Sequence, residues 1–199
     1  MYKKFFKRFF DIIMAFIALI VFAIPMIIFS IIIKCTSKGT VFFRQTRVGK
    51  CKKPFEIIKF RSMSSDTPKD VPTHLLSSAK SFITPVGAFM RKYSIDELPQ
   101  IFNVLGGSMS IVGPRPALYN QYDLIEERDK YLANDVKPGI TGLAQISGRD
   151  ELPIDVKSKF DGEYVKKISF YFDIKCIFRT VFKVVKKEGV KEGRNEGFL

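Results

Sequence analysis

The feature that most constrains this chain is a long apolar run near its start. Residues 9–33 carry a single charge, Asp11. A helix rises about 1.5 Å per residue, so this run is long enough to cross the roughly 30 Å hydrocarbon layer of a bilayer. It is too long for the core of a cleaved signal peptide, and no small-x-small cleavage site follows it. We therefore expect residues 1–36 to form a membrane helix that stays attached.

Basic residues flank this run on both sides. They are Lys3, Lys4, Lys7 and Arg8 before it, and Lys34, Lys38, Arg44, Arg47 and Lys50 after it. Cytoplasmic flanks are enriched in Lys and Arg, which favours both ends on the cytoplasmic side. Pro25 removes one backbone hydrogen bond inside the run and predicts a kink. A kinked, re-entrant helix satisfies both observations, and a straight span with a tolerated proline is the alternative.

Length and net charge limit the number of domains and the kinds of partner that the chain can have. The 199 residues suffice for one ordinary domain, and 33 Lys and Arg against 20 Asp and Glu give a net charge of +13. That excess favours an anionic partner: nucleic acid, a phosphorylated small molecule or an anionic membrane face. The three distant cysteines and the single His74 argue against a zinc site, a disulfide scaffold or a histidine triad. We expect a compact domain at residues 37–188 and a flexible tail at 189–199.

The pattern of this domain is mainly helical with one β-hairpin. VFFRQTRVG and PFEIIKF alternate as two strands around the turn GKCKKP. Helices are expected at residues 85–92, 98–105 and 117–132, and the polar stretch at residues 62–81 is expected to be a mobile loop.

Near the C-terminus, residues 173–187 predict an amphipathic helix. Its apolar stripe consists of Ile174, Ile177, Phe178, Val181, Phe182 and Val185. Its opposite face carries Lys175, Arg179, Lys183, Lys186 and Lys187. Such a stripe usually faces a protein core, but in a membrane-attached chain a helix lying in the headgroup layer is the competing interpretation, which we favour.

The stretch RKYSIDELPQIFNVL places two adjacent acids, Asp96 and Glu97, before an apolar helix. Ser94 and Glu97 fit a capping box, and Pro99 is the alternative first helical residue. The positive end of a helix and the nearby Arg91 or Lys92 favour the ionised form of both acids. Taken alone, this pattern is explained as helix capping.

Two glycine-rich stretches add groups suited to phosphate. GGSMSIVGPRPAL holds Arg115 between two prolines, and KPGITGLAQISGR ends in Arg149. Arginine presents a planar fork that matches phosphate oxygens, and the glycines permit close backbone approach. Both are also ordinary turn compositions, and the GxxxxGK[ST] motif of P-loop nucleotidases is missing from the sequence.

Four stretches of this sequence closely resemble the bacterial sugar transferases, the small monotopic phosphoglycosyl transferases. They follow a basic, proline-containing apolar helix in the order IIKFRSM, SIDELPQIFNVL, SIVGPRPAL and KPGITGLAQISGR. The resemblance covers nearly the whole chain. It implies a re-entrant membrane helix with a compact cytoplasmic α/β catalytic domain at residues 37–188 and interfacial amphipathic helices. It also implies an enzyme of the bacterial inner membrane, on the cytoplasmic face, that transfers a sugar-1-phosphate from a UDP-sugar to polyprenyl phosphate, releases UMP and initiates glycan synthesis.

The resemblance also assigns roles to residues. Asp96 is the nucleophile that forms a covalent phospho-sugar intermediate, Glu97 handles a metal or a proton, and both belong to a Mg²⁺ site that Mn²⁺ could share. The basic motif positions expected to hold phosphates are Lys59, Arg61, Arg91, Arg115 and Arg149. Departures from the family pattern are Ile24, Ser108 and Lys137, where relatives often have Ser, an acid and Arg.

Two rival interpretations remain at this point. A membrane-attached basic protein that binds nucleic acid or an acidic polymer would use the same charges without catalysis, although the resemblance speaks against nucleic acid. An enzyme that transfers directly in a ternary complex would use Glu97 as general base and Asp96 as metal ligand.

Overall fold

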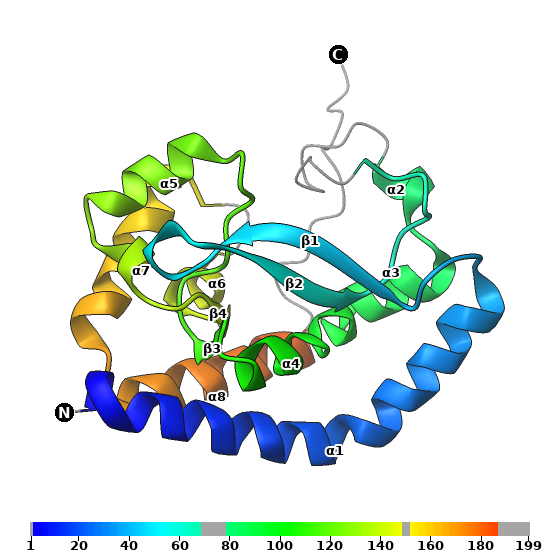
Figure 1. Ribbon diagram of the computed structural model, residues 1–199, viewed down its shortest axis with the longest axis horizontal. Helices are drawn as coiled ribbons and strands as arrows, with labels where there is room; N and C mark the ends of the chain where they lie inside the picture. The colour runs from blue at the N-terminus through cyan, green and yellow to red at the C-terminus, as the bar shows by residue number, and fades with distance from the viewer. Residues whose placement is uncertain (1, 69–78, 149–151, 187–199) are drawn as a thin grey trace.

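The computed structural model describes residues 2–68, 79–148 and 152–186. The described chain is mostly helical with two small sheets, so the expectation of a mainly α fold with a hairpin is confirmed. Arg149, His74 and the tail from residue 187 lie outside the described residues, as does half of the expected loop at 62–81, namely residues 69–78. Figure 1 shows one long helix passing beneath the remaining elements.

That helix, α1 (Lys7–Thr36), follows a short π-helical turn, η1 (Tyr2–Phe6), and continues unbroken through Pro25. Figure 1 shows it running below α8 and α4 and then bending upward beside α3. The missing N–H of Pro25 leaves one carbonyl of the preceding turn without its helical partner, which accounts for a bend. Within the described chain, α1 is the one helix long and apolar enough to cross a membrane.

Asp11 is buried against the domain instead of facing outward with its apolar neighbours. Its side chain is 1% exposed, and it accepts hydrogen bonds from the Ser110 hydroxyl at 2.8 Å and the Ile111 N–H at 3.0 Å. Lys7 Nζ lies 2.9 Å from Asp11 and 3.0 Å from Asp173, which is also buried. Tyr2 donates to the same Asp173 at 2.6 Å. The only charge of the apolar run therefore anchors the helix to the domain.

The predicted hairpin is confirmed. β1 (Phe42–Val48) and β2 (Pro54–Phe60) pair antiparallel from Phe42 opposite Phe60 to Val48 opposite Pro54. A 3-10 turn, η2 (Lys50–Lys52), joins them, with Cys51 and Lys52 at positive φ. Ile57 and Phe60 are buried on opposite faces of β2 and belong to two different core clusters, so both faces of this strand contribute to the core.

A second, parallel sheet was not predicted. β3 (Ser110–Val112) pairs with β4 (Gly139–Thr141), and both lie in the glycine-rich stretches. A Cβ on Gly139 would stand 2.1 Å from the Gly113 nitrogen, and one on Gly142 would stand 2.1 Å from the Gly113 oxygen. The close backbone approach that the glycines permit is therefore between these two segments of the chain itself.

Two of the three expected central helices begin or end elsewhere. α3 (Pro85–Lys92) matches its prediction, and α4 (Gln100–Leu105) follows a 3-10 turn, η4 (Ile95–Glu97). The helix predicted at residues 117–132 is only α5 (Tyr122–Asp129), because Ala117 and Leu118 extend the hairpin: the Ala117 carbonyl accepts from Val48 N–H at 2.9 Å. The remaining short elements are α2 (Ala79–Phe82), η5 (Ala133–Asp135) and α6 (Leu143–Ser147).

Two long helices complete the fold, α7 (Ile154–Lys167) and α8 (Phe170–Lys186). The expected amphipathic helix corresponds to α8. Its Asp173 and Cys176 are buried, whereas Phe178, Phe182 and Val185 are 58–71% exposed. The apolar stripe is therefore only partly covered by the protein, which is not the usual burial of a core-facing helix.

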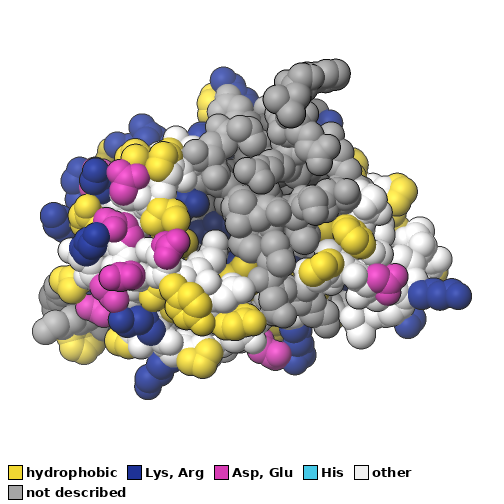
Figure 2. Space-filling view, turned by 90° about the horizontal axis from the view of Figure 1, so that it is seen from above, with side chains coloured by type: hydrophobic (Ala, Val, Ile, Leu, Met, Phe, Trp, Pro, Cys, Tyr) yellow, Lys and Arg dark blue, Asp and Glu magenta, His cyan; other side chains and the backbone are white. Residues whose placement is uncertain are grey.

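Figure 2 shows the face turned away from α1. On its described part, Lys and Arg side chains alternate with Asp and Glu over the α5 side of the molecule. Ion pairs in and beside α5 join Lys130 to Glu127 at 2.6 Å and Lys52 to Asp129 at 2.7 Å. The positive excess of the chain is therefore offset by acids in this region.

Asp11 and Asp155 both form an ion pair with a lysine four positions away, but only Asp11 is buried, so removing Asp11 should lower stability far more. Asp11→Ala leaves the Ile111 N–H without its buried acceptor and takes one of two buried acceptors from Lys7 and from the Ser110 hydroxyl, so it should lower the free energy of unfolding by about 3–5 kcal/mol. The matched control is Asp155→Ala, which removes an exposed i,i+4 pair with Lys159 at 3.5 Å and should cost about 0.5 kcal/mol or less. Urea unfolding in detergent measures both, and equal losses would contradict the anchor.

Candidate active site

The Asp96–Glu97 pair lies on the single turn of η4. Ser94, which precedes it, has φ 55° and makes no side-chain capping hydrogen bond. The predicted capping box is therefore wrong, because a left-handed Ser94 cannot present its hydroxyl as a cap and the Glu97 carboxylate has other partners. Pro99 is also not the first residue of α4 but its N-cap. The two acids are placed by a tight turn instead of by a helix cap.

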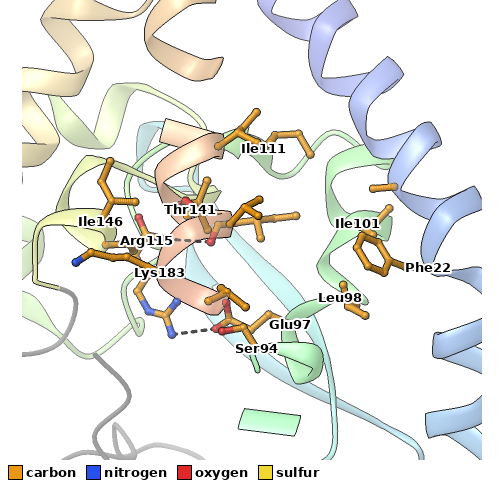
Figure 3. A pocket seen from close by; sticks show the side chains of 17 residues that line it. Phe22, Ser94, Glu97, Leu98, Ile101, Ile111, Arg115, Thr141, Ile146 and Lys183 are labelled. Carbon is orange, nitrogen blue, oxygen red and sulfur yellow. Dashed lines mark hydrogen bonds and ion pairs between the residues drawn. The ribbon is translucent and has the colours of Figure 1, made fainter. Parts of the chain in front are cut away.

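Two cations hold Glu97 in place. Lys59 Nζ, on β2, lies 2.8 Å from Glu97 Oε1, and Arg115 Nη2, just after β3, lies 3.0 Å from the same oxygen. Figure 3 shows the Arg115 contact as a dashed line. Burial alone would raise the pKa of Glu97, but Arg115 and Lys59 outweigh burial and hold the pKa well below its usual range. Glu97 is therefore a fixed, ionised carboxylate.

Asp96 is in a different electrostatic state although it is the next residue. Its side chain is buried, and within the described chain it makes no hydrogen bond. Burial, helped by the charge of Glu97, raises the pKa of Asp96 despite the opposing fields of Lys59, Arg91 and Arg115. The expectation that its position favours the ionised form is therefore wrong for Asp96. Neighbouring acids with separated pKa values are typical of sites where the two groups have different roles.

The structure brings three of the five predicted basic residues to this pair. Lys59 and Arg115 contact Glu97, and Arg91 is close enough for its charge to lower the pKa of Asp96. Arg61 is used elsewhere: it donates to the Ser37 carbonyl at 2.9 Å and the Ser37 hydroxyl at 2.8 Å, at the end of α1. The fifth predicted residue, Arg149, lies outside the described residues.

Arg128 and Asp161 support the site and were not predicted. Arg128, on α5, forms a buried pair with Asp161 of α7 at 2.6 Å, and its Nη1 donates to the Arg115 carbonyl at 2.9 Å. This contact fixes the backbone that carries Arg115. The two partners are 33 positions apart and belong to no motif, so spacing alone gave no signal for them.

A pocket of about 210 Å³ opens beside Glu97. Its walls come from α1, α4, α6, α8 and the ends of β3 and β4. Figure 3 shows Phe22, Ile101 and Leu98 on one side, with Arg115 and Lys183 on the other. Most of the lining side chains are apolar, and the charged ones are Glu97, Arg115 and Lys183. The site therefore combines a charged cluster with an apolar recess that includes residues of the membrane-length helix.

The sequence matches the family model described as bacterial sugar transferase over residues 2–187. The chain therefore belongs to the bacterial sugar transferase family, and the resemblance seen in its motifs is confirmed.

Named relatives are consistent with this membership. The chain is 43% identical to the UDP-glucose:undecaprenyl-phosphate glucose-1-phosphate transferase of Escherichia coli, over 89% of this chain and 39% of that protein. It is 39% identical to the uncharacterized sugar transferase EpsL of Bacillus subtilis, over 94% and 90%. It is 38% identical to the undecaprenyl-phosphate galactose phosphotransferase of Salmonella typhimurium, over 94% and 42%. The chain thus spans about two fifths of the Escherichia coli and Salmonella relatives and most of EpsL.

The electrostatics of the pair predict opposite stability changes. At neutral pH, Asp96→Asn should stabilise the fold, because it removes a buried charge whose pKa is raised. Glu97→Gln should lower stability by about 1.5–3 kcal/mol, because Lys59 and Arg115 lose their counter-charge.

The pH dependence of the two changes follows from the same shifts. The Asp96→Asn gain should fade as the pH falls from the raised pKa of Asp96 in the folded protein towards the ordinary range of Asp, and it should be absent below that range, where the unfolded carboxyl is also protonated. The Glu97→Gln loss should fade as the pH falls below the ordinary range of Glu. Thermal unfolding followed by circular dichroism measures both, and shifts of the same sign at neutral pH would refute the assignment.

Proposed function

We propose that this chain transfers a sugar-1-phosphate from a UDP-sugar to a polyprenyl phosphate, giving a polyprenyl-diphospho-sugar and UMP. The relatives named for glucose-1-phosphate and galactose phosphate transfer support a UDP-hexose as donor. The observation that carries the proposal is the buried Asp96 carboxyl, which has no hydrogen bond among the described residues and lies in the field of Lys59, Arg91 and Arg115.

Asp96 is the nucleophile of a two-step reaction in this proposal. A carboxylate oxygen of Asp96 attacks the sugar-bearing phosphorus, the bond from that phosphorus to the bridging oxygen breaks, and UMP leaves with that oxygen. A phosphate oxygen of the lipid then attacks the same phosphorus and restores the Asp96 carboxylate. A carboxylate that burial keeps poorly solvated, without a fixed hydrogen bond, is free to form this bond.

The surrounding cations make the approach of an anion possible. Lys59, Arg91 and Arg115 offset the repulsion between Asp96 and a diphosphate, and they stabilise charge that develops on the leaving phosphate. Burial lowers the pKa of Lys59, and Glu97 opposes that shift. Glu97 therefore serves first to hold Lys59 and Arg115 in position.

Mg²⁺ fits this site as an ion shared with the donor diphosphate. Within the described chain no group of three or more acids, histidines or cysteines could hold a metal. Glu97 Oε1 already accepts from two cations, which leaves its second oxygen and the Asp96 carboxylate as protein ligands. Mg²⁺ commonly uses one or two carboxylates with water and substrate phosphates, and it would neutralise diphosphate charge. Mn²⁺ suits the same oxygen ligands.

Attachment to the cytoplasmic face of a bacterial inner membrane is part of the proposal. The exposed apolar residues of α1 and the exposed stripe of α8 support contact with a bilayer. The cations on both sides of the apolar run support a re-entrant α1 with both ends in the cytoplasm. The alternative of a non-catalytic binding protein gains no support from the relatives, which are named for transfer of sugar phosphates.

The nucleophile is tested by leaving out the lipid acceptor. Enzyme and UDP-sugar alone should release up to one equivalent of UMP and leave a phospho-sugar on Asp96, seen by mass spectrometry of the intact protein. Asp96→Asn should abolish the adduct and lower turnover by about 10³-fold or more, the scale expected for a lost nucleophile. UMP release only when both substrates are present would instead support a ternary complex. Asp66→Asn, at an exposed acid within the stretch of residues 62–68, serves as the matched control.

The re-entrant arrangement is tested by the position of both ends of α1. Lys4→Cys and Lys38→Cys should both react with a membrane-impermeant thiol reagent only from the cytoplasmic side, in a background where Cys35 and Cys51, the exposed thiols, are replaced by Ser. Pro25→Leu should restore the missing hydrogen bond and shift a fraction of molecules to a full span. A periplasmic residue 4 in the parent protein would exclude the re-entrant form.

A further inference from the structure

The pocket beside Glu97 has a lining suited to a hydrocarbon. Its apolar wall includes Ala18 and Phe22 of α1 and Ile101 of α4. Thr141 and Thr180, two of its seven polar or charged lining residues, satisfy each other at 2.6 Å. A nucleobase would bring carbonyl and N–H groups that need partners when buried, and this wall offers few. A water molecule occupies roughly 30 Å³ in the liquid. The pocket volume of about 210 Å³ corresponds to about seven such molecules, which is enough for one five-carbon unit.

Helix α8 forms one wall of this pocket. Ile177, Val181 and Val184 line the pocket, at helical spacing of four and three. The next stripe around the helix, Phe178 and Val185, is exposed. Apolar side chains therefore continue from the pocket across α8 to the surface.

The charged end of the pocket suits a phosphate. Arg115 and Lys183 line it together with Glu97, and Figure 3 shows both cations on the side opposite Phe22. A lipid phosphate that enters beside the Glu97 carboxylate needs cations to offset the repulsion. The ammonium of Lys183 is a compact charge with three donors on a flexible stem, and it is provided by the same helix that covers the apolar wall.

We infer that this pocket binds the acceptor lipid, with its first isoprene unit against α1 and α8 and its phosphate held by Lys183 together with Arg115. This inference rests on the proposed function and adds a place for the second substrate. It makes Lys183 a substrate-binding residue in the second step, in which a lipid phosphate oxygen attacks the phosphorus carried by Asp96 and the carboxylate leaves. The donor nucleotide then binds outside this pocket, so changes in it should affect the two substrates differently.

Two variants test the inference by steady-state kinetics with undecaprenyl phosphate. Val184→Trp fills the pocket, and Lys183→Gln removes the cation. Each should raise the KM for the lipid at least tenfold, leave the KM for the UDP-sugar within twofold, and leave the lipid-independent release of UMP unchanged. Lys183→Arg should recover part of the lipid KM. The matched controls on α7, Ile154→Trp and Lys166→Gln, should change nothing more than twofold.

A labelling measurement keeps the test independent of folding defects in the variants. Parent protein illuminated with a diazirine-bearing farnesyl phosphate should carry the label on peptides that contain Phe22 or Val181. Unlabelled undecaprenyl phosphate should suppress the labelling, and UDP-sugar should not.

The outcomes separate this inference from the proposed function. A parent protein that releases no UMP from UDP-hexoses, with or without lipid, refutes the function. An active parent whose lipid KM stays within twofold in both variants, or whose label lies only on other peptides, overturns the lipid pocket and leaves the transferase intact.

Discussion

The position of the site relative to α1 depends on one buried carboxylate. Asp11 accepts hydrogen bonds from Ser110 and Ile111 of β3, and β3 leads directly into the segment that carries Arg115. A carboxylate inside a helix of apolar residues costs free energy unless it is fully paired, so the domain and the helix stabilise each other only in this one register. The charged cluster is thereby held beside an apolar helix, as the proposed reaction between a soluble and a lipid substrate requires.

The two acids of the site show how a short turn can separate neighbouring groups. In the 3-10 geometry of η4, with about three residues per turn, adjacent side chains point in directions well apart. Glu97 faces Lys59 and Arg115 and is held ionised, while Asp96 remains buried with a raised pKa. Residues of the same chemistry thus acquire a positioning role and a proposed reactive role. The unpaired, buried carboxylate that destabilises the fold is therefore the same group that is proposed to react.

Local patterns were predicted well and long-range contacts were not. Alternation and a turn-forming GKCKKP were enough to predict the hairpin, and the helix predicted at residues 85–92 has the bounds of α3. The pairing of β3 with β4 joins segments about 29 positions apart whose strands have only three residues, too few for a period to be visible. The start of α5 was missed because Ala117 and Leu118 add to the hairpin, a tertiary contact that overrides helix propensity. The pairing of Glu97 with Lys59 and Arg115, and the Arg128–Asp161 support, depend on the assembled fold in the same way.

The anchor of α1 also has a consequence for the order of events during synthesis. The partners of Asp11 lie 99 and 100 positions later in the chain, and the second partner of Lys7 is Asp173. At about 5–20 residues per second, α1 is complete roughly 4–15 s before Ser110 exists. During that interval Asp11 has only Lys7 as a partner, and no folded domain can orient the helix. Whatever sets the direction of α1 must then be local to the helix and its flanks, which gives Pro25 and the neighbouring lysines a role that ends before the active site is built.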